Sequence, residues 1–252
     1  MRTFLLNRKY NLIGLIVLVH LLFSYYYIPR YFSAAIGSVL IISLALIIWK
    51  KDGLYWIGLQ ISGKQILYSI LAFIGFLFGS YLIIHFIAQK NGVQIFTGNY
   101  KDVVHTLFYT LNEEIVIGAL LLKGIKQALK KTPDWMISVG VAFVFAIIHL
   151  VFFKWVFLNK GDLGVITLLS LFAVGIFRNN LILKTGHIGF SWAIHFAWVY
   201  IMLGSQHLIN VKEYYLSDFE RFEMYLGDIR ILIACSVLVV LSFFFRRKTI
   251  SS

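Results

Sequence analysis

The sequence predicts an all-α polytopic membrane protein, a helix bundle with about eight transmembrane helices. Two features of its composition support this class: 60% of the 252 residues are hydrophobic, and only 13% are charged. A soluble domain would need more polar side chains to cover its surface. The apolar residues also fall into long runs separated by short clusters of Lys and Arg. We therefore expect a single membrane domain over residues 1–252.

Each apolar run approaches the roughly 20 residues that a helix needs to cross the hydrocarbon core. The predicted spans are Asn11 to Ile28, Tyr31 to Trp49, Ile66 to Ala88, Val103 to Leu122, Met136 to Leu158, Leu163 to Phe177, Ile188 to Leu208 and Ile229 to Phe245. The first run follows a basic stretch but has no small-residue cleavage site, so we expect it to be retained.

The basic residues are unequally divided between the two sets of loops. If the N-terminus is cytoplasmic, the cytoplasmic loops hold 15 of the 23 Lys and Arg residues, with Arg178 counted among them, and the opposite loops hold 8. The positive-inside rule then places both termini in the cytoplasm. Because the net charge of +12 comes from these loop clusters, we expect no nucleic-acid partner.

Two acidic residues lie inside a predicted span, whereas the other nine of the 11 lie in loops or at span edges. Glu113 and Glu114 are adjacent near the middle of the fourth span. A charge at that depth costs about 2.5 kcal/mol or more on insertion scales. The pair therefore needs partners, water or protonation. Structural pairing with histidines or a lysine is one interpretation, and a functional site is the one that we favour.

Two histidines lie well inside other predicted spans. His149 follows Phe145 by four residues, which places both side chains on one helix face, and His195 lies in the seventh span. One carboxylate with an imidazole can deprotonate water, and a second imidazole can stabilise an oxyanion. The set therefore predicts amide hydrolysis without a serine or cysteine nucleophile. The remaining histidines are expected to be packing or interface residues: His20, His85, His105 and His207.

The same side chains leave a metal site open as an alternative. Glu113, His149 and His195 could ligate a zinc ion with an open position for water. We rank this second because a metalloprotease site is usually marked by two histidines four residues apart on one helix. No such pair occurs in the sequence. No cofactor is expected, with a divalent metal such as zinc as the alternative.

Three segments that carry these residues resemble the motifs of a known family. They are Glu113 to Leu121, Phe145 to His149, and Thr185 to Ile188 followed by His195. As a set they are similar in order, spacing and span position to the CPBP family. That family comprises CAAX-prenyl proteases together with bacteriocin-processing and bacteriocin-immunity proteins, also called Abi proteins. The similarity extends over about 103–200.

The resemblance implies an intramembrane protease core and assigns roles to its residues. By similarity Glu113, paired with Glu114, acts with His149 to activate water, and His195 helps to bind the oxyanion. The implied activity is an endopeptidase that cuts a peptide bond in a hydrophobic or membrane-associated peptide. Its partners would be that peptide or a membrane-protein substrate and the lipid bilayer of a bacterial plasma membrane. The oligomeric state stays open.

Two positions depart from the family pattern. Gly118 stands where the first motif usually has an arginine, and Arg178, Lys123 or a protonated histidine are candidates to replace that cation. Val199 stands where the third motif often has Asn or Asp. Since valine has no hydrogen-bond donor, half of the usual oxyanion site is missing there, and Asn112 and Asn180 are candidate replacements.

These departures keep two other functions open. A catalytically impaired relative would act as a bacteriocin-immunity or peptide-binding membrane protein, and a proton-coupled transporter would also use buried carboxylates and histidines. A further histidine, His187, is unusual in the third motif. We expect it to cap a helix or lie at an interface, because it is about 12 Å along a helix from His195.

Overall fold

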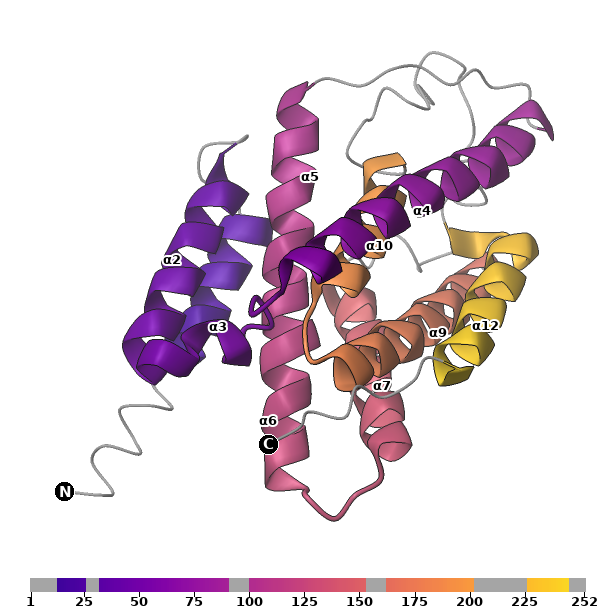
Figure 1. The fold of residues 1–252 in the computed structure, drawn as a ribbon. Helices are drawn as coiled ribbons and strands as arrows, with labels where there is room; N and C mark the ends of the chain where they lie inside the picture. Colours follow the sequence, from indigo (N-terminus) through magenta and orange to yellow (C-terminus); the bar gives the residue numbers. More distant parts are fainter. Residues whose placement is uncertain (1–12, 26–31, 91–99, 153–161, 202–225, 245–252) are drawn as a thin grey trace.

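The computed structural model describes residues 13–25, 32–90, 100–152, 162–201 and 226–244 (Figure 1). Within these ranges every regular element is a helix and none is a strand, so the all-α prediction is confirmed. The elements are the N-terminal helix Ile13–Phe23 with η1 (Leu21–Tyr25), α2 (Ser33–Trp49), η2 (Lys50–Asp52), α3 (Gly53–Trp56), α4 (Gly63–Lys90), α5 (Tyr100–Glu113), η3 (Glu114–Leu121), α6 (Leu122–Ala128), α7 (Asp134–Phe152), α9 (Asp162–Thr185), α10 (Gly189–Val199) and α12 (Ile229–Phe244).

Each predicted span overlaps one or more of these helices, and the parts of the spans at 11–12, 26–28, 31, 153–158, 202–208 and 245, together with His207, lie outside the described residues. By length and composition, three described segments are able to cross a membrane: Ser33–Trp56, Gly63–Ile83 and Gly164–Thr185. Three other apolar helices are shorter: Ile13–Phe23, Asp134–Leu150 and Ile229–Phe244. The protein is therefore an integral membrane protein, whereas the count of eight spans and the orientation of the termini stay predictions.

The sixth predicted span ends too early. Helix α9 continues beyond Phe177 to Thr185 because the polar residues that follow are buried and have partners within the bundle. Asn179 donates a hydrogen bond of 2.8 Å to the Ser138 carbonyl, for example. Arg178 is only 3% exposed. Counting it as a loop residue was therefore wrong, although the remaining 14 basic residues (15 − 1) still outnumber the 8 opposite.

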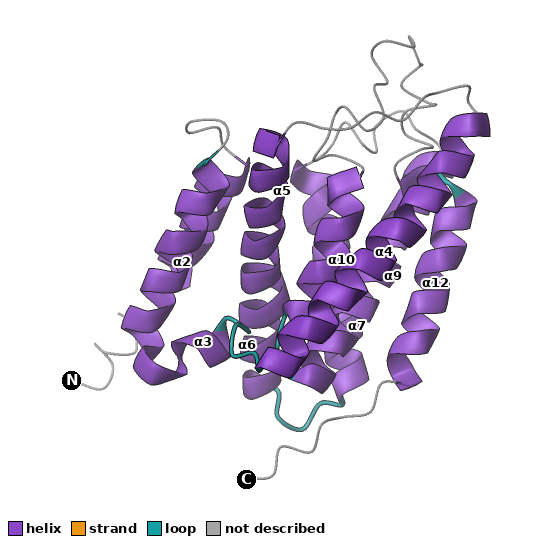
Figure 2. Ribbon diagram, turned by 45° about the horizontal axis from the view of Figure 1, so that its top comes forward, coloured by secondary structure: helices purple, strands orange, loops and turns teal. Residues whose placement is uncertain are grey.

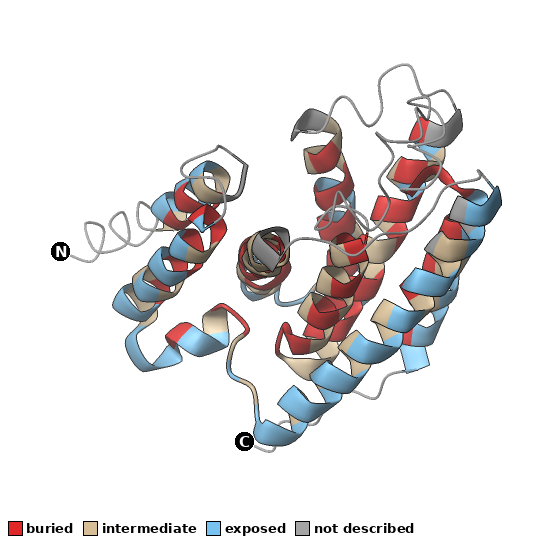
Figure 3. Ribbon diagram, turned by 90° about the horizontal axis from the view of Figure 1, so that it is seen from above, coloured by how far each residue is buried: buried red, intermediate tan, exposed pale blue. Residues whose placement is uncertain are grey.

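One long helix, α5 continued by η3 and α6, runs through the middle of the bundle. Viewed from above, it lies between the N-terminal helices on one side and α7, α9 and α10 on the other (Figure 3). Asn112 fastens it to α2, because its side chain donates to the Ala34 carbonyl (2.9 Å) and accepts from the Ser38 hydroxyl (2.6 Å).

The outward faces of α2, α4 and α12 carry exposed apolar side chains, as a lipid-facing surface requires.

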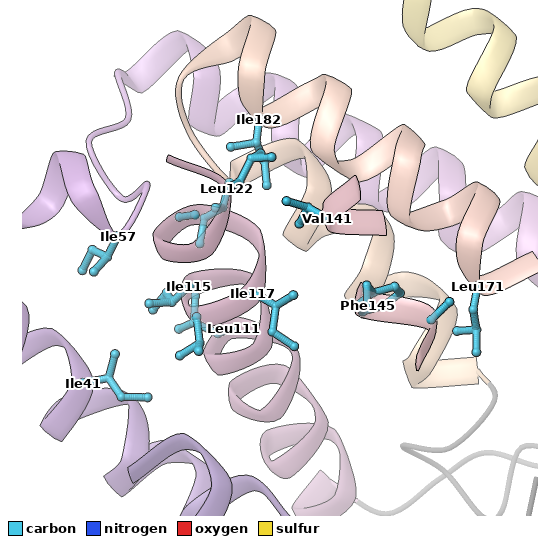
Figure 4. Packing of buried hydrophobic residues seen from close by; sticks show 14 of the residues in the cluster. Ile41, Ile57, Leu111, Ile115, Ile117, Leu122, Val141, Phe145, Leu171 and Ile182 are labelled. Atoms are coloured by element: carbon cyan, nitrogen blue, oxygen red, sulfur yellow. The ribbon is translucent and has the colours of Figure 1, made fainter. Parts of the chain in front are cut away.

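The core forms around this central helix. Ile115 and Leu122 are fully buried, with Ile41 and Ile57 on the side of the N-terminal helices and Val141 on the other side (Figure 4). The remaining helices stand alongside it (Figure 2). These contacts fix the rotation of the helix that carries both glutamates.

Small residues bring α7 and α9 close together. A Cβ atom on Gly175 would lie 3.0 Å from the Cβ atom of Ala142, so the two helices meet without an intervening side chain. Stacking of Phe73 on Phe196, with centroids 5.2 Å apart, joins α4 to α10. At the end of α12, Ser242 accepts a hydrogen bond of 2.8 Å from Asn180 of α9.

Candidate active site

The two buried acids lie where the central helix changes its geometry. Glu113 is the last residue of α5 and Glu114 is the first of η3, and both are fully buried. Each residue turns a helix by about 100°, so side chains two residues apart point in nearly opposite directions. Asn112 accordingly contacts α2, whereas Glu114 contacts α10. The π-helical turns that begin at Glu114 are a rare geometry that frequently occurs at functional sites.

Glu114 is the centre of a cluster of polar side chains. Its Oε1 atom lies 3.0 Å from Nδ1 of His195, and its Oε2 atom accepts a 2.7 Å hydrogen bond from the Ser191 hydroxyl. Ser191 and His195 are four residues apart on α10 and so share one face. Since Nδ1 of His195 is engaged by the carboxylate, its Nε2 atom is the ring nitrogen that can act on a bound substrate.

His149 is oriented by its own helix. Its Nδ1 atom lies 2.9 Å from the Phe145 carbonyl oxygen, and the two rings meet edge to face with centroids 4.4 Å apart. Because a carbonyl oxygen can only accept, Nδ1 carries the proton in the neutral imidazole and Nε2 has the lone pair. This tautomer suits a general base.

Arg178 adds a buried positive charge to the cluster. Its Nη1 atom lies 4.0 Å from Oε1 of Glu114, and its guanidinium lies over the Phe145 ring, 4.1 Å from the centroid. Nε and Nη2 donate weakly to Oδ1 of Asn179, at 3.4 and 3.3 Å. Asn179 is itself fixed by its bond to Ser138, so the guanidinium is held on two sides.

Glu113 occupies a separate position beside this cluster. Its side chain interacts electrostatically with His149, His195 and Arg178, and also with His20 of the N-terminal helix. His20 is only 2% exposed, as expected of a packing residue, yet it faces an acid rather than apolar side chains alone. The two glutamates therefore share His195 and Arg178, whereas Ser191 bonds to Glu114 and His20 interacts with Glu113.

A cavity of about 410 Å³ brings these groups together. One part of its wall is polar and is formed by Glu114, His149, Arg178, Ser191 and His195. The rest is mainly apolar and includes Gly75 and Gly79 of α4 and Ala234, Cys235 and Leu238 of α12. Glu113 does not belong to the wall. The volume falls within the range of small-molecule and peptide pockets.

Comparison with known families identifies the segment that builds the polar wall. Residues 102–201 match the family model for type II CAAX prenyl endopeptidase Rce1-like proteins. This segment is similar to the CAAX protease family. The match contains Glu113, Glu114, His149 and His195, and it confirms the resemblance seen in the sequence. No curated protein and no solved structure matches the chain.

The missing arginine of the CAAX protease core has a structural counterpart. A Cβ atom on Gly118 would lie 3.0 Å from Oε2 of Glu114, so a side chain at this position would meet the carboxylate directly. Arg178 brings a guanidinium to the other oxygen of the same carboxylate. Of the candidate replacements, Arg178 and the histidine His195 therefore both lie at Glu114.

Lys123, another candidate, lies elsewhere in the CAAX protease core. Its ammonium group donates to the carbonyl oxygens of Tyr55 and Gly186, the latter at 3.1 Å, and packs on the Tyr55 ring. Burial lowers the pKa of Lys123 to about 8. This lysine joins the α3 segment to the turn before α10 and does not serve Glu114.

Val199 lines the cavity as the third motif predicts, and it is 6% exposed. Neither proposed amide replaces the missing donor. Asn112 is bonded to α2 and Asn180 to Ser242, and neither belongs to the cavity wall. Their assignment as oxyanion donors was therefore wrong, because helix rotation points both away from the CAAX protease site.

His187 caps helix α10 of the CAAX protease core, as predicted. Its Nδ1 atom accepts a 3.1 Å hydrogen bond from the Gly189 backbone N–H.

Sequence reasoning missed Ser191, although its four-residue distance from His195 was a usable signal. It also missed the contributions of α4 and α12, which lie outside the family match and carry no motif.

The zinc alternative requires three donor groups that converge on one point. Within residues 13–25, 32–90, 100–152, 162–201 and 226–244, no group of three His, Cys, Asp or Glu side chains is arranged to hold a metal ion.

Proposed function

We propose that the protein is an intramembrane endopeptidase that hydrolyses a peptide bond in a hydrophobic or membrane-associated peptide. The observation that carries this proposal is the cavity wall, to which α7 contributes His149, η3 contributes Glu114 and α10 contributes His195. Three helices thus bring a base, an acid and a second imidazole to one apolar cavity. The family match over residues 102–201 supports the same reaction class.

In the proposed reaction, Nε2 of His149 takes a proton from water as its oxygen attacks the peptide carbonyl carbon. Glu113 stabilises the resulting imidazolium through their electrostatic interaction. His195, in its imidazolium form beside Glu114, donates from Nε2 to the developing oxyanion. Collapse of the intermediate breaks the C–N bond, and His149 returns the proton to the leaving amine.

The test is cleavage of labelled hydrophobic peptides by the purified protein in detergent, with new peptide ends identified by mass spectrometry. We expect Glu113→Gln, His149→Ala and His195→Ala each to lower kcat by about 100-fold or more. The matched control is His85→Ala, which removes a histidine of α4 that stacks on Tyr81 outside the cavity. Equal cleavage by wild type and His149→Ala would reject the proposal.

Val199 favours a second candidate, a membrane protein that binds a peptide in this cavity without cutting it. This function predicts saturable binding of the same peptides with no new peptide ends. A conferred phenotype such as bacteriocin resistance would then survive Glu113→Gln combined with His149→Ala. Proton uptake by proteoliposomes on peptide addition, again without cleavage, would instead indicate transport.

A further inference from the structure

The cavity lacks a hydrogen-bond donor at the position where a second contact to an oxyanion is expected. Val199 lies in its wall and offers only methyl groups, and both candidate amides face other helices. A hydrolase of this kind stabilises the charge on the tetrahedral intermediate with preorganised donors. His195 alone would supply one.

Arg178 is a buried donor in the same wall. It is 3% exposed, and among the described residues its Nη1 atom has no acceptor within hydrogen-bonding distance. The nearest acid oxygen, Oε1 of Glu114, lies 4.0 Å away. Buried polar groups in proteins rarely lack a partner, and one that does calls for an explanation such as a catalytic role. An oxygen atom of a bound substrate could occupy this position.

We propose that Arg178 is a catalytic residue that donates a hydrogen bond from Nη1 to the oxyanion of the tetrahedral intermediate. This inference rests on the proposed endopeptidase function. It assigns to α9 the donor that position 199 of α10 lacks, and it gives the oxyanion two donors from different helices, Nη1 of Arg178 and Nε2 of His195.

The surroundings of Arg178 suit this role. Stacking on Phe145 and the contacts with Asn179 hold the guanidinium plane before substrate binds. The guanidinium is charged at every working pH, so it needs no proton from the reaction. Its charge and that of the His195 imidazolium balance the carboxylates of Glu113 and Glu114, and the negative charge of the oxyanion forms together with the positive charge of the His149 imidazolium.

The chemical step is balanced without a further reactant. The water oxygen forms a bond to the carbonyl carbon, the carbonyl π electrons move to oxygen, and one water proton passes to His149. Arg178 and His195 donate to that oxygen without transferring a proton. When the C–N bond breaks, the amine takes the proton from His149, and the products are a carboxylate or carboxylic acid and an amine.

The first experiment measures kcat and KM for peptide cleavage with Arg178→Met and Arg178→Lys. We expect kcat to fall by about 100-fold for Arg178→Met, with KM within a factor of about three. Lysine keeps the charge but not the planar donor, so Arg178→Lys should recover only part of the loss. The matched control is Lys184→Met, which removes a cation of the same helix that bonds the Ser242 and Phe243 carbonyls.

A second experiment separates this inference from the proposed function. Binding of a peptide phosphinate, whose tetrahedral centre carries an anionic oxygen, is compared with binding of the uncharged peptide of the same sequence. Wild type and Lys184→Met should prefer the phosphinate by about 100-fold, and Arg178→Met should lose that preference. This measurement decides the role of Arg178 even if no peptide is cleaved.

Other results would overturn the inference. An unchanged kcat with a raised KM would mean that Arg178 holds a ground-state group such as a peptide carboxylate. An unchanged phosphinate preference in Arg178→Met would mean that the guanidinium does not reach the anionic oxygen. Thermal unfolding of each variant in detergent shows that a loss is not due to misfolding, and Arg178→Lys provides the comparison if Arg178→Met does not fold.

Discussion

Gly118 lies against Glu114 so closely that a Cβ atom would approach Oε2 of the carboxylate to 3.0 Å. The same atom would lie 3.0 Å from Cδ1 of Ile182. The absence of a side chain at position 118 thus leaves room for the Glu114 carboxylate to reach Ser191 and His195. Gly118 and Arg178 therefore both adjoin the Glu114 carboxylate: the glycine leaves space beside Oε2, and the guanidinium lies 4.0 Å from Oε1.

This relationship predicts that Gly118→Val will impair activity. The branched side chain has to displace either Glu114 or Ile182, and displacement of Glu114 breaks its contact with His195. We expect kcat for peptide cleavage to fall by about tenfold or more. Gly124→Val is the matched control on the same continuous helix, because a Cβ atom there meets nothing within 4 Å. Equal activity of the two variants would contradict the prediction.

Ser191 is expected to be a positioning residue for Glu114. Ser191→Ala removes the 2.7 Å hydrogen bond to Oε2, and bonds to charged groups contribute about 1.5–3 kcal/mol. We expect kcat to fall by about tenfold, the pH profile to shift, and Ser191→Thr to restore most of the activity. Ser236→Ala, which removes an exposed hydroxyl bonded within α12, should change neither quantity. A pH profile identical to wild type would speak against the role.

The close approach of α7 and α9 predicts a stability effect. Gly175→Val places methyl groups where a Cβ atom is already 3.0 Å from Ala142, and overpacking of this kind costs about 1–3 kcal/mol. Thermal unfolding in detergent should show a lower midpoint. On α7, Gly140→Val adds the same side chain into open space and serves as the control. An unchanged midpoint for Gly175→Val would mean that the helices separate at no cost.

Lys123 predicts a pH dependence of stability. Because burial lowers the pKa of Lys123 from 10.5 to about 8, the unfolded chain binds this proton more firmly than the folded protein. The charged lysine therefore weakens the fold at low pH, and stability relative to Lys123→Met should rise between about pH 8 and pH 10.5. Unfolding midpoints of both proteins across this range measure the difference. A difference that stays constant would refute the prediction.

Hydrolysis by His149-activated water predicts independence of added metal. Prolonged dialysis against a strong zinc chelator should leave peptide cleavage within about twofold of the untreated protein, since no metal-bound water is required. Metal content measured on the same samples provides the control. Loss of activity that zinc restores would support the alternative with Glu113, His149 and His195 as ligands.

Much of the fold could be predicted because hydropathy depends on local sequence. Apolar runs marked the long described helices, though not the short elements η2 and α3, and two adjacent acids inside one run marked the central helix of the bundle. The prediction failed at Phe177, because Arg178, Asn179 and Asn180 resemble a loop in sequence but are buried in the bundle, where Asn179 and Asn180 bond to Ser138 and Ser242 on other helices.

Sequence alone determined that two carboxylates and two imidazoles lie in apolar helices, and that their motifs resemble those of CAAX proteases. Only the tertiary structure decided that His195 contacts Glu114, that Asn112 and Asn180 face away from the cavity, and that Arg178 enters it. The physical reason is that the direction of a side chain depends on helix rotation and crossing. Both are set by packing between residues far apart in the chain, such as Gly175 against Ala142.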